Sequence, residues 1–359
     1  MRVLIMAGGT GGHVFPALAT AEELRREGCE IAWMGTRRGL EARLVPAAGI
    51  PIHWIGVGGL RGKGWRTRLG APLALGRALS GALAIVRKLR PAVALGMGGF
   101  ASGPGGIAAW LTRRPLVIHE QNAVPGLTNR VLARFATTVL EGFPGSFPAA
   151  RRARCVGNPV RADVVALPPP AARLAGRNGR VRLLVFGGSQ GAAILNGTLP
   201  EALAALPPES RPEVWHQAGE RHLDIARVAY AEAGVEVRLE AFVDDVAAAY
   251  AWADLAVCRA GALTVAELAA AGLGAVLVPF AAAVDDHQTR NAEHLADRGA
   301  AVIMAQQSLT ADALAQTLRK LCADRAQLQR MAEAARTLAR PDAARELAQA
   351  CLDAAGGGR

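Results

Sequence analysis

The fold is decided by the stretch Val3-Leu4-Ile5-Met6-Ala7-Gly8-Gly9-Thr10-Gly11-Gly12-His13-Val14-Phe15-Pro16. Its apolar start, Val3–Met6, predicts a buried strand. The glycines that follow allow a tight turn in which a ligand can approach the backbone. Apolar residues then recur at helical spacing, and Pro16 suits the first turn of a helix. The stretch therefore predicts a strand, a glycine loop and a helix whose N-terminus can bind a phosphate or another anion, with His13 at the mouth of the loop.

A near copy of this stretch lies about half a chain further on, at Val181-Arg182-Leu183-Leu184-Val185-Phe186-Gly187-Gly188-Ser189-Gln190-Gly191-Ala192. It repeats the strand, the glycine pair, a hydroxyl residue and a further glycine before a helix. A chain of 359 residues is long enough for two domains. Because ligands bind outside the carboxyl ends of strands in open α/β sheets, we expect two similar halves that face each other across one cleft.

The rest of the chain alternates strand-like and helical segments, which predicts a parallel, doubly wound α/β sheet in each half. In the first half we expect strands at Val3–Met6, Ile31–Met34, Ile52–Ile55, Ala92–Leu95, Leu116–Ile118 and Thr137–Leu140, with helices such as Ala17–Glu27 and Pro72–Leu89. In the second half we expect strands at Val181–Phe186, Glu213–His216, Val235–Leu239, Leu255–Cys258, Ala275–Val278 and Ala301–Met304. Two long helices, at about 310–338 and 341–353, are expected to finish the chain, and the proline- and glycine-rich segment 157–180 is interpreted as a linker.

The charge of the chain is consistent with an anionic partner. The formal net charge is +11, which fits a nucleic acid, a nucleotide or an acidic membrane surface, although an arginine- and alanine-rich composition explains it equally well. Aromatic residues make up only 4% of the chain, which argues against the stacking surfaces that bind single-stranded nucleic acid. We therefore expect no nucleic acid partner.

Several motifs are absent from the sequence. The five cysteines contain no Cys-x-x-Cys, so we expect cytosolic thiols rather than disulfides or a zinc site. There is no Asp-x-Asp or His-Glu-x-x-His, and Val14 stands where a dinucleotide-binding fingerprint needs glycine. No apolar run reaches the length of a membrane span, and the chain starts with a core strand rather than a signal peptide. The sequence therefore predicts no metal site and no membrane-spanning helix.

Two further segments of the first half follow predicted strands, at the position where ligands bind in parallel sheets. Gly96-Met97-Gly98-Gly99-Phe100-Ala101-Ser102-Gly103-Pro104-Gly105-Gly106 is a second glycine loop, and two such loops side by side could seat a diphosphate. His119-Glu120-Gln121-Asn122 directly follows the strand Leu116–Ile118. Each segment also has a plainer interpretation, as a tight turn or a solvated turn without a ligand.

The second half offers a comparable pattern at Asp254-Leu255-Ala256-Val257-Cys258-Arg259-Ala260-Gly261-Ala262-Leu263-Thr264-Val265-Ala266-Glu267. Here a strand ends at Cys258 and a helix opens after Gly261, so its first amides could hold a diphosphate. Glu267, expected in the first turn of that helix, could bind both hydroxyls of a ribose, or it could simply cap the helix. The polar loop Asp285-Asp286-His287-Gln288-Thr289-Arg290-Asn291 is expected to face the same cleft or to be solvated.

His13 and one basic segment each have two interpretations. An imidazole titrates near neutrality, so His13 could accept the proton of a sugar hydroxyl, or it could only cap the loop or helix. The segment Arg61-Gly62-Lys63-Gly64-Trp65-Arg66-Thr67-Arg68 precedes a helical stripe formed by Leu75, Leu79, Leu83 and Val86. Together they could dock on an anionic bilayer, or they could be a core helix with solvated basic residues.

Six motifs taken together resemble the MurG family of bacterial peptidoglycan glycosyltransferases. They are Gly8-Gly9-Thr10-Gly11-Gly12-His13, Gly96 to Gly106, His119-Glu120-Gln121-Asn122, Gly157-Asn158-Pro159-Val160-Arg161, Gly187-Gly188-Ser189-Gln190-Gly191-Ala192 and Gly261-Ala262-Leu263-Thr264. The resemblance runs from residue 3 past residue 290, and it implies a GT-B fold of two Rossmann-like domains that face each other across a cleft. It implies an N-terminal acceptor and membrane-associating domain at 1–163, on which a C-terminal helix at about 341–359 packs back, and a donor-binding domain at 164–340.

The resemblance also implies a reaction. It is the inverting, metal-independent transfer of N-acetylglucosamine (GlcNAc) from UDP-GlcNAc to the 4-hydroxyl of the muramyl sugar of lipid I, which is undecaprenyl-diphospho-muramoyl-pentapeptide. The product is lipid II, and no cofactor is needed. The implied partners include the anionic cytoplasmic face of the bacterial inner membrane, where the protein would be peripheral, and other cell-wall synthesis proteins. A related GT-B glycosyltransferase, or a UDP-GlcNAc epimerase, acting on another acceptor is the alternative.

The resemblance assigns residues to this reaction. His13 is the candidate base, with Glu120 or Asn122 as helpers. The UDP-GlcNAc residues are Thr10, Gly11, Gly12, Asn122, Arg161, Ser189, Val243, Ala262, Leu263, Thr264, Val265, Ala266, Glu267 and Gln288. The diphosphate and acceptor loops contribute Gly98, Gly99, Ser102, Gly103 and Gln190. The sequence departs from the family pattern at Phe100, where tyrosine is common, at Ala260, where serine is expected, and in the loop 281–287.

Overall fold

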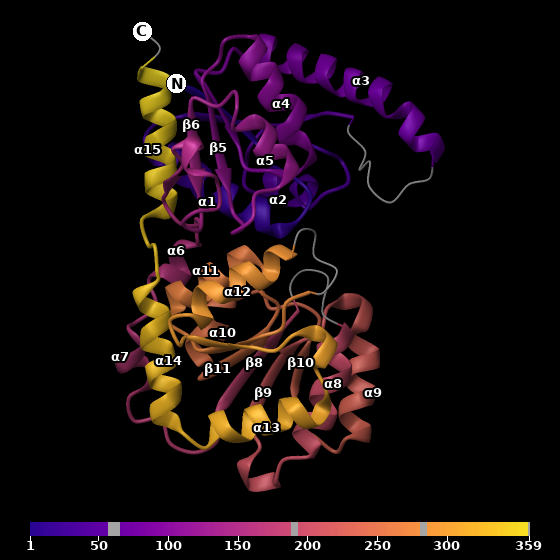
Figure 1. The fold of residues 1–359 in the computed structure, drawn as a ribbon, viewed down its shortest axis with the longest axis vertical. Helices are drawn as coiled ribbons and strands as arrows, with labels where there is room; N and C mark the ends of the chain where they lie inside the picture. The colour runs from indigo at the N-terminus through magenta and orange to yellow at the C-terminus, as the bar shows by residue number, and fades with distance from the viewer. Residues whose placement is uncertain (57–64, 188–192, 281–285, 358–359) are drawn as a thin grey trace. The chain divides into compact units, whose positions relative to one another are not determined.

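The computed structural model describes residues 1–56, 65–187, 193–280 and 286–357, and for residues 65–72 it describes the backbone only. The chain divides into two compact units. The first comprises Met1–Arg161 and Arg340–Arg359, and the second comprises Ala162–Ala339. Each unit contains one sheet in which every strand pair is parallel, and this confirms the predicted α/β class (Figure 1).

The first unit has a seven-stranded sheet in the order β3-β2-β1-β4-β5-β6-β7. The strands are β1 (Arg2–Met6), β2 (Glu30–Gly35), β3 (Ile52–Trp54), β4 (Val93–Gly96), β5 (Leu116–Glu120), β6 (Thr138–Glu141) and β7 (Arg154–Cys155). β1 is central, because Val3 lies beside Ile31 of β2 and beside Val93 of β4. The strand order reverses between β1 and β4, which is where open α/β sheets bind ligands.

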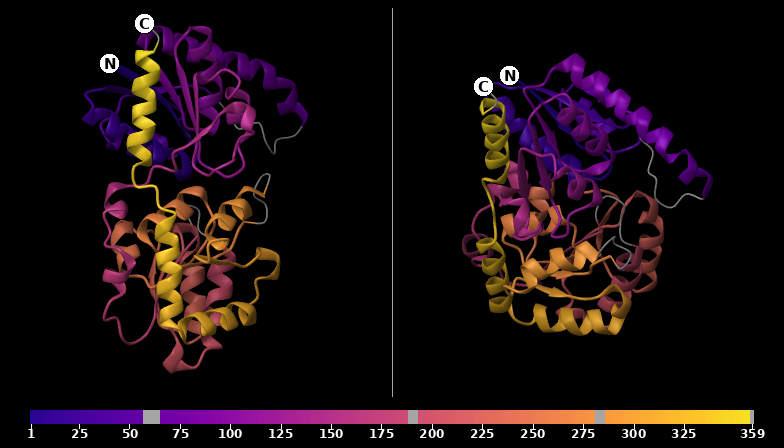
Figure 2. Two further views of the ribbon diagram at one scale, coloured as in Figure 1. Left: turned by 60° about the vertical axis from the view of Figure 1, so that its left-hand side comes forward. Right: turned by 45° about the horizontal axis from the view of Figure 1, so that its top comes forward.

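Helices cover both faces of this sheet, so β1 is buried on both sides. They are α1 (Gly11–Arg26), α2 (Glu41–Ala47), α3 (Trp65–Leu89), α4 (Gly99–Leu111), α5 (Leu127–Leu132) and α15 (Ala343–Gly356), with a short 3-10 helix at Ala149–Arg151. Val3 and Ile5 pack in one core with α1 and α15, whereas Leu4 and Met6 pack in the other with α3 and α4. Figure 2 shows α15, the yellow helix at the end of the chain, lying along the first unit.

The second unit has a six-stranded sheet in the order β10-β9-β8-β11-β12-β13. Its strands are β8 (Arg182–Phe186), β9 (Glu213–Gln217), β10 (Arg238–Glu240), β11 (Leu255–Cys258), β12 (Ala275–Leu277) and β13 (Ala301–Ile303). Its helices are α6 (Ala162–Val165), α7 (Pro170–Leu174), α8 (Ala193–Ala204), α9 (Leu223–Glu232), α10 (Val246–Trp252), α11 (Ala262–Ala271), α12 (His287–Ala296), α13 (Ala311–Cys322) and α14 (Arg325–Thr337). Short 3-10 helices lie at Pro208–Ser210, Glu220–His222 and Gln306–Ser308. The central strands pack their apolar side chains against α8, α13 and α14.

Several predicted boundaries were wrong, each for a local reason. α1 begins at Gly11 rather than Ala17, because Thr10 takes the extended N-cap conformation, so Pro16 lies inside the helix and not in its first turn. The segment 310–338 is two helices, because the Asp324 carboxylate accepts a hydrogen bond from the Gln327 amide at 2.8 Å and starts α14. The predicted linker contains α6 and α7, and the two-residue strand β7 had no sequence signal.

Candidate active site

The first glycine loop connects β1 to α1 and places His13 in the third position of the helix. The His13 ring is half-buried, and its Nδ1 lies 3.3 Å from Oγ1 of Thr10, the N-cap residue. A Cβ atom on Gly98 would lie only 2.6 Å from Cδ2 of His13. The imidazole therefore packs against the bare backbone of the loop that follows the neighbouring strand, β4.

The second glycine loop touches the first one directly. Gly98 and Gly99 have φ of 89° and 78°, in the left-handed region that favours glycine. A Cβ atom on Gly99 would also lie 2.2 Å from the carbonyl oxygen of Gly8, which no side chain can do. The two loops therefore lie side by side at the carboxyl edge of the sheet, as the sequence predicts.

Ser102 in α4 is buried beneath these loops. Its Oγ lies 2.6 Å from the carbonyl oxygens of both Met6 and Gly98, and its single proton is donated to one of them at a time. The hydroxyl therefore links β1 to the second loop inside the protein, and we expect it to shape the loop rather than to contact a ligand. Gly103 is half-buried one residue further along α4, and the Phe100 side chain is exposed.

Glu120, at the end of β5, is a buried carboxylate held by four hydrogen bonds. One oxygen accepts the backbone amide of Asn122 at 3.0 Å and the Asn122 side-chain amide at 3.1 Å. The other accepts the Gly126 amide and the Asn129 side chain, both at 3.0 Å. These hydrogen bonds fix the conformation of the loop that carries Asn122, so a positioning role suits Glu120 better than proton transfer.

His119 connects the same strand to the segment that ends at Arg161. Its Nε2 lies 2.9 Å from the carbonyl oxygen of Gly157, and its Nδ1 lies 3.1 Å from Nε2 of Gln121. Burial lowers the pKa of His119 to about 4, so the ring is neutral and donates to Gly157. Arg161, at the end of this segment, lies over the ring of Phe15 in α1, with 5.6 Å between the guanidinium carbon and the ring centre.

In the second unit, α11 begins at Ala262 directly after the N-cap residue Gly261, close to the end of β11. Residues Ala262–Glu267 form the first part of this helix, so its leading amides point out of its N-terminus. Glu267 is the sixth residue of α11 and therefore lies in the second turn, not in the first turn as predicted. It is 7% exposed, and its Oε2 accepts a hydrogen bond from the Tyr250 hydroxyl at 3.0 Å.

Three other residues lie near the carboxyl ends of strands in this unit. Gln288, in the first turn of α12, accepts a hydrogen bond from the Phe280 amide on its Oε1 at 2.9 Å. Val243 is buried three residues beyond β10. Arg259 follows β11, donates to the carbonyl of Val278 at 3.1 Å and lies over the Phe280 ring, while burial lowers its pKa.

Some of the predicted residues lie outside the described residues. These are Ser189 and Gln190, the part 281–285 of the variable loop, and the basic residues Arg61 and Lys63. Arg66 and Arg68 lie in α3, where only the backbone is described. The predicted leucine stripe of α3 is divided: Leu79, Leu83 and Val86 pack against the core, whereas Leu75 is exposed beside the exposed Leu73.

The structure thus collects the site residues of each half at the carboxyl edge of a sheet. In the first unit the residues after β1, β4 and β5 meet, because these three strands are neighbours. In the second unit the residues after β11 and β12 meet, and Val243 follows β10 at the far edge. Over the described part of the chain, no three His, Cys, Asp or Glu side chains are grouped so that they could hold a metal ion.

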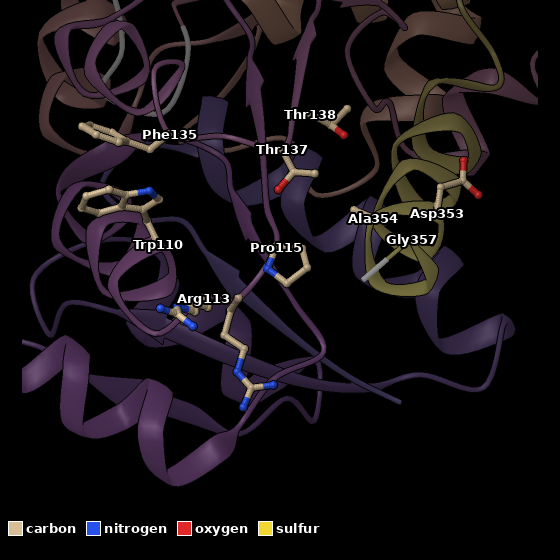
Figure 3. A pocket seen from close by; sticks show the side chains of 10 residues that line it. Trp110, Arg113, Pro115, Phe135, Thr137, Thr138, Asp353, Ala354 and Gly357 are labelled. Carbon is tan, nitrogen blue, oxygen red and sulfur yellow. The ribbon is translucent and has the colours of Figure 1, made fainter. Parts of the chain in front are cut away.

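A pocket of about 580 Å³ lies at the opposite, amino edge of the first sheet (Figure 3). It is lined by Trp110, Arg113, Arg114, Pro115, Phe135, Thr137, Thr138, Asp353, Ala354 and Gly357. Because ligands of parallel sheets bind beyond the carboxyl ends, we do not place a substrate in this pocket. Among the described helices, none is both long and apolar enough to cross a bilayer.

Three residues that hold the site together could not be recognised in the sequence. Glu41 accepts the Gly9 amide in the first glycine loop, and Asn129 donates to Glu120. Tyr250 donates to Glu267. Each lies far along the chain from its partner or outside the glycine motifs, so no local pattern marks it. Asn291, part of the polar segment that the sequence predicts as a loop, instead lies in α12 and donates to the Ala260 carbonyl at 3.1 Å.

Comparison with known proteins identifies the family. The model of the glycosyltransferase family 28 N-terminal domain matches residues 3–141, and that of the C-terminal domain matches residues 182–347. A relative from Nitrosococcus oceani, named UDP-N-acetylglucosamine–N-acetylmuramyl-(pentapeptide) pyrophosphoryl-undecaprenol N-acetylglucosamine transferase, is 59% identical over 357 residues, covering 99% of both chains.

Two solved structures show the same fold. The crystal structure of Acinetobacter baumannii MurG is 40% identical, has a TM-score of 0.85 and covers 98% of this chain and 99% of that one. The calicheamicin glycosyltransferase CalG4, at 20% identity and a TM-score of 0.67, covers 98% of both chains and supports the fold alone. Because the two family models cover most of the sequence and the relative matches it almost end to end, the chain belongs to glycosyltransferase family 28 and has the GT-B fold of two Rossmann-like domains.

Proposed function

We propose that the protein transfers GlcNAc from UDP-GlcNAc to the 4-hydroxyl of the muramyl sugar of lipid I, with inversion at the anomeric carbon, to form lipid II. The observation that carries this proposal is the 59% identity over 99% of both chains with a relative named for this transfer. The site chemistry agrees with it. Two glycine loops and a helix N-terminus suit anionic diphosphates, and an imidazole lies beside the loops.

We infer that the second unit binds the donor. The amides at the start of α11 can stabilise the diphosphate that leaves, and Glu267 can accept hydrogen bonds from the ribose hydroxyls. Gln288 and Val243, together with Ser189, complete the donor residues of this unit. Thr10, Gly11, Gly12, Asn122 and Arg161 of the first unit are also proposed to bind UDP-GlcNAc. Gly98, Gly99, Gly103 and Gln190 are proposed to belong to the diphosphate and acceptor loops.

His13 is the proposed general base. The 4-hydroxyl oxygen forms a bond to the anomeric carbon while the bond from that carbon to the UDP oxygen breaks, so UDP leaves with the bonding electrons. The hydroxyl proton passes to the imidazole. If Nδ1 carries its hydrogen toward Thr10 Oγ1, which lies 3.3 Å away, Nε2 is the basic nitrogen that takes this proton. Glu120 and Asn122 then act as helpers that shape the loop beside it.

The reaction is tested with the purified full chain, UDP-GlcNAc and a soluble lipid I analogue. We expect one GlcNAc to be added to the analogue for each UDP released. UDP release without transfer, or transfer only to an acceptor that lacks the muramyl sugar, would favour the alternative of a related enzyme with another acceptor.

We also propose that the protein binds the anionic cytoplasmic face of the inner membrane as a peripheral protein. The net charge of +11, the basic segment Arg61–Arg68 and the exposed Leu73 and Leu75 of α3 support this proposal. An acceptor that is anchored in a bilayer by its lipid needs an enzyme that reaches that surface.

A further inference from the structure

Glu41 is a fully buried carboxylate that the proposed mechanism does not use. It is the first residue of α2 and is 0% exposed. Its Oε2 accepts the Gly9 amide at 2.9 Å, and its Oε1 accepts the Thr36 amide at 3.0 Å and the Thr36 hydroxyl at 2.7 Å. No ion pair among the described residues includes it. Its charge is therefore stabilised by protein N–H and O–H donors.

Three glycines from different segments make the space for this carboxylate. A Cβ atom on Gly8 would lie 2.4 Å from Oε1 of Glu41, and one on Gly39 would lie 1.9 Å from Oε2. A Cβ atom on Gly35 would lie 2.9 Å from Cγ. None of the three has a positive φ. They are glycines because of Glu41 and not because of their backbone conformation, so part of the glycine-rich pattern encloses a protein carboxylate rather than a ligand.

The carboxylate holds the loop that carries the proposed base. Gly9 has a φ of 97°, donates its amide to Glu41 and accepts a hydrogen bond on its carbonyl from the Leu40 amide at 3.2 Å. The next residue, Thr10, caps α1 and contacts the His13 ring. Residues at the start of α2 thus bond both the amide and the carbonyl of Gly9, which lies four residues before His13.

We propose that Glu41 is a positioning residue: its buried carboxylate sets the conformation of the first glycine loop and thereby the place of the His13 imidazole. This inference rests on the proposed role of His13 in the transfer reaction. The ionised carboxylate suits the site because all three of its partners are donors. A glutamine would turn an NH₂ group toward one of these donors and could not satisfy all of them.

The first test is kinetic. Glu41→Gln should lower kcat by about 10²-fold, the size of effect that a small misplacement of a reacting group can cause. Gly39→Ala should reproduce this loss, because its Cβ would displace Oε2 although no residue of the loop that carries His13 is substituted. Gly81→Ala in α3, where a Cβ meets nothing within 4 Å, is the matched control and should keep the wild-type kcat.

A double-mutant cycle distinguishes positioning from general damage to the fold. In a His13→Ala background, Glu41→Gln should cost little, because the group it positions is gone. A full second loss of about 10²-fold in that background, or wild-type kcat in both Glu41→Gln and Gly39→Ala, would overturn the proposal.

Hydrogen exchange separates this inference from the proposed function. The amides of residues 8–13 should exchange faster in Glu41→Gln than in the wild-type protein, whether or not His13 is the base. If His13→Ala keeps its kcat while these amides lose protection in Glu41→Gln, the base assignment fails and the loop-holding role stands. Unchanged protection would refute the role of Glu41 itself.

Discussion

The two units organise their charged groups in opposite ways around similar sheets. In the first unit, three buried glutamates, one at the start of α2 and two at the ends of β5 and β6, hold the loops of the carboxyl edge. Glu41 and Glu120 do so as described above, and Glu141 accepts the amides of Gly145 at 2.8 Å and Phe147 at 3.1 Å. In the second unit, the buried Asp254 lies before β11, at the amino edge, and is paired with Arg177 and Arg325.

This difference indicates where each domain needs fixed geometry. Backbone amides bound by internal carboxylates cannot adapt to a ligand, so the loops of the first unit are preorganised around His13. In the second unit the arginine pairs stabilise the far edge of the sheet, and Arg173 donates to the carbonyl at the end of α11 at 2.8 Å. This contact fixes the C-terminal end of α11, so the amides at the N-terminal end of the helix remain available to bind a ligand.

The largest expected effect is at the carboxyl edge of the first sheet. His13→Ala should lower kcat by about 10²–10⁴-fold, the usual contribution of a general base, with donor affinity and fold little changed. The acidic limb of the pH–kcat profile should disappear in this variant. Near-normal kcat with an unchanged profile in His13→Gln would instead show that the histidine is structural and that the contrast between the two edges is not catalytic.

Each unit also contains one buried histidine, so the pH dependence of unfolding can be compared between the two units. Burial lowers the pKa of both His119 and His216 to about 4, below the value of about 6.5 in an unfolded chain. Between these values the unfolded chain binds more protons, so the free energy of unfolding falls as the pH falls from about 6.5 to 4, by about 3 kcal/mol per histidine at most.

Urea unfolding at several pH values measures this dependence. His119→Gln should flatten the pH dependence of the first unit only, and His216→Gln that of the second. His216 bonds the Tyr230 hydroxyl at 2.8 Å, so replacing it also tests that contact at neutral pH. An unaltered slope in both variants would show that neither ring is held neutral.

A smaller effect is expected at the donor edge. Glu267→Ala should raise the KM for UDP-GlcNAc by roughly tenfold, because a hydrogen bond to a charged group contributes at least about 1.5 kcal/mol. The KM for the acceptor should stay unchanged. Tyr250→Phe is the control, since it removes only the hydroxyl that supports the carboxylate. An equal rise in both KM values would contradict the ribose role.

The smallest effect per residue concerns the membrane. Changing Arg61, Lys63, Arg66 and Arg68 to serine should weaken sedimentation with anionic vesicles by about 1 kcal/mol for each residue that lies near the surface. Added salt should weaken binding of the unaltered protein in the same direction. If vesicle binding is independent of salt, of anionic lipid and of these four residues, the membrane proposal is refuted. The comparison of the two sheets does not depend on this result.

The sequence predicted the strands, the sheet class and the glycine loops because these depend on local patterns. Alternating or continuous apolar runs mark the buried strands, and the glycines after β1 and β4 do lie side by side. The exact turn of Glu267 could not be predicted, since it depends on the residue at which α11 begins. The division of the α3 stripe into buried Val86 and exposed Leu75 depends on how far α4 covers the helix.

Glu41 shows most clearly what a local reading cannot find. Its importance comes from Gly8, Gly35 and Gly39 meeting around one carboxylate, and the first of these lies in the loop after β1, far from Glu41 along the chain. The glycines of the first loop were interpreted as room for a ligand. The structure assigns one of them, Gly8, to a protein side chain and to the close approach of Gly99.

The C-terminal helix has a consequence for how the protein is made. α15 contributes Leu347, Ala348, Ala350, Cys351 and Ala354 to the same buried cluster as Val3 and Ile5. The first unit is therefore assembled from one segment that is translated before the second unit and one that is translated after it. The second unit is continuous and can complete its core earlier, although it is translated after most of the first. Until α15 is released, the part of this sheet face that α15 covers stays exposed, and the nascent chain carries that apolar surface while the second unit is made.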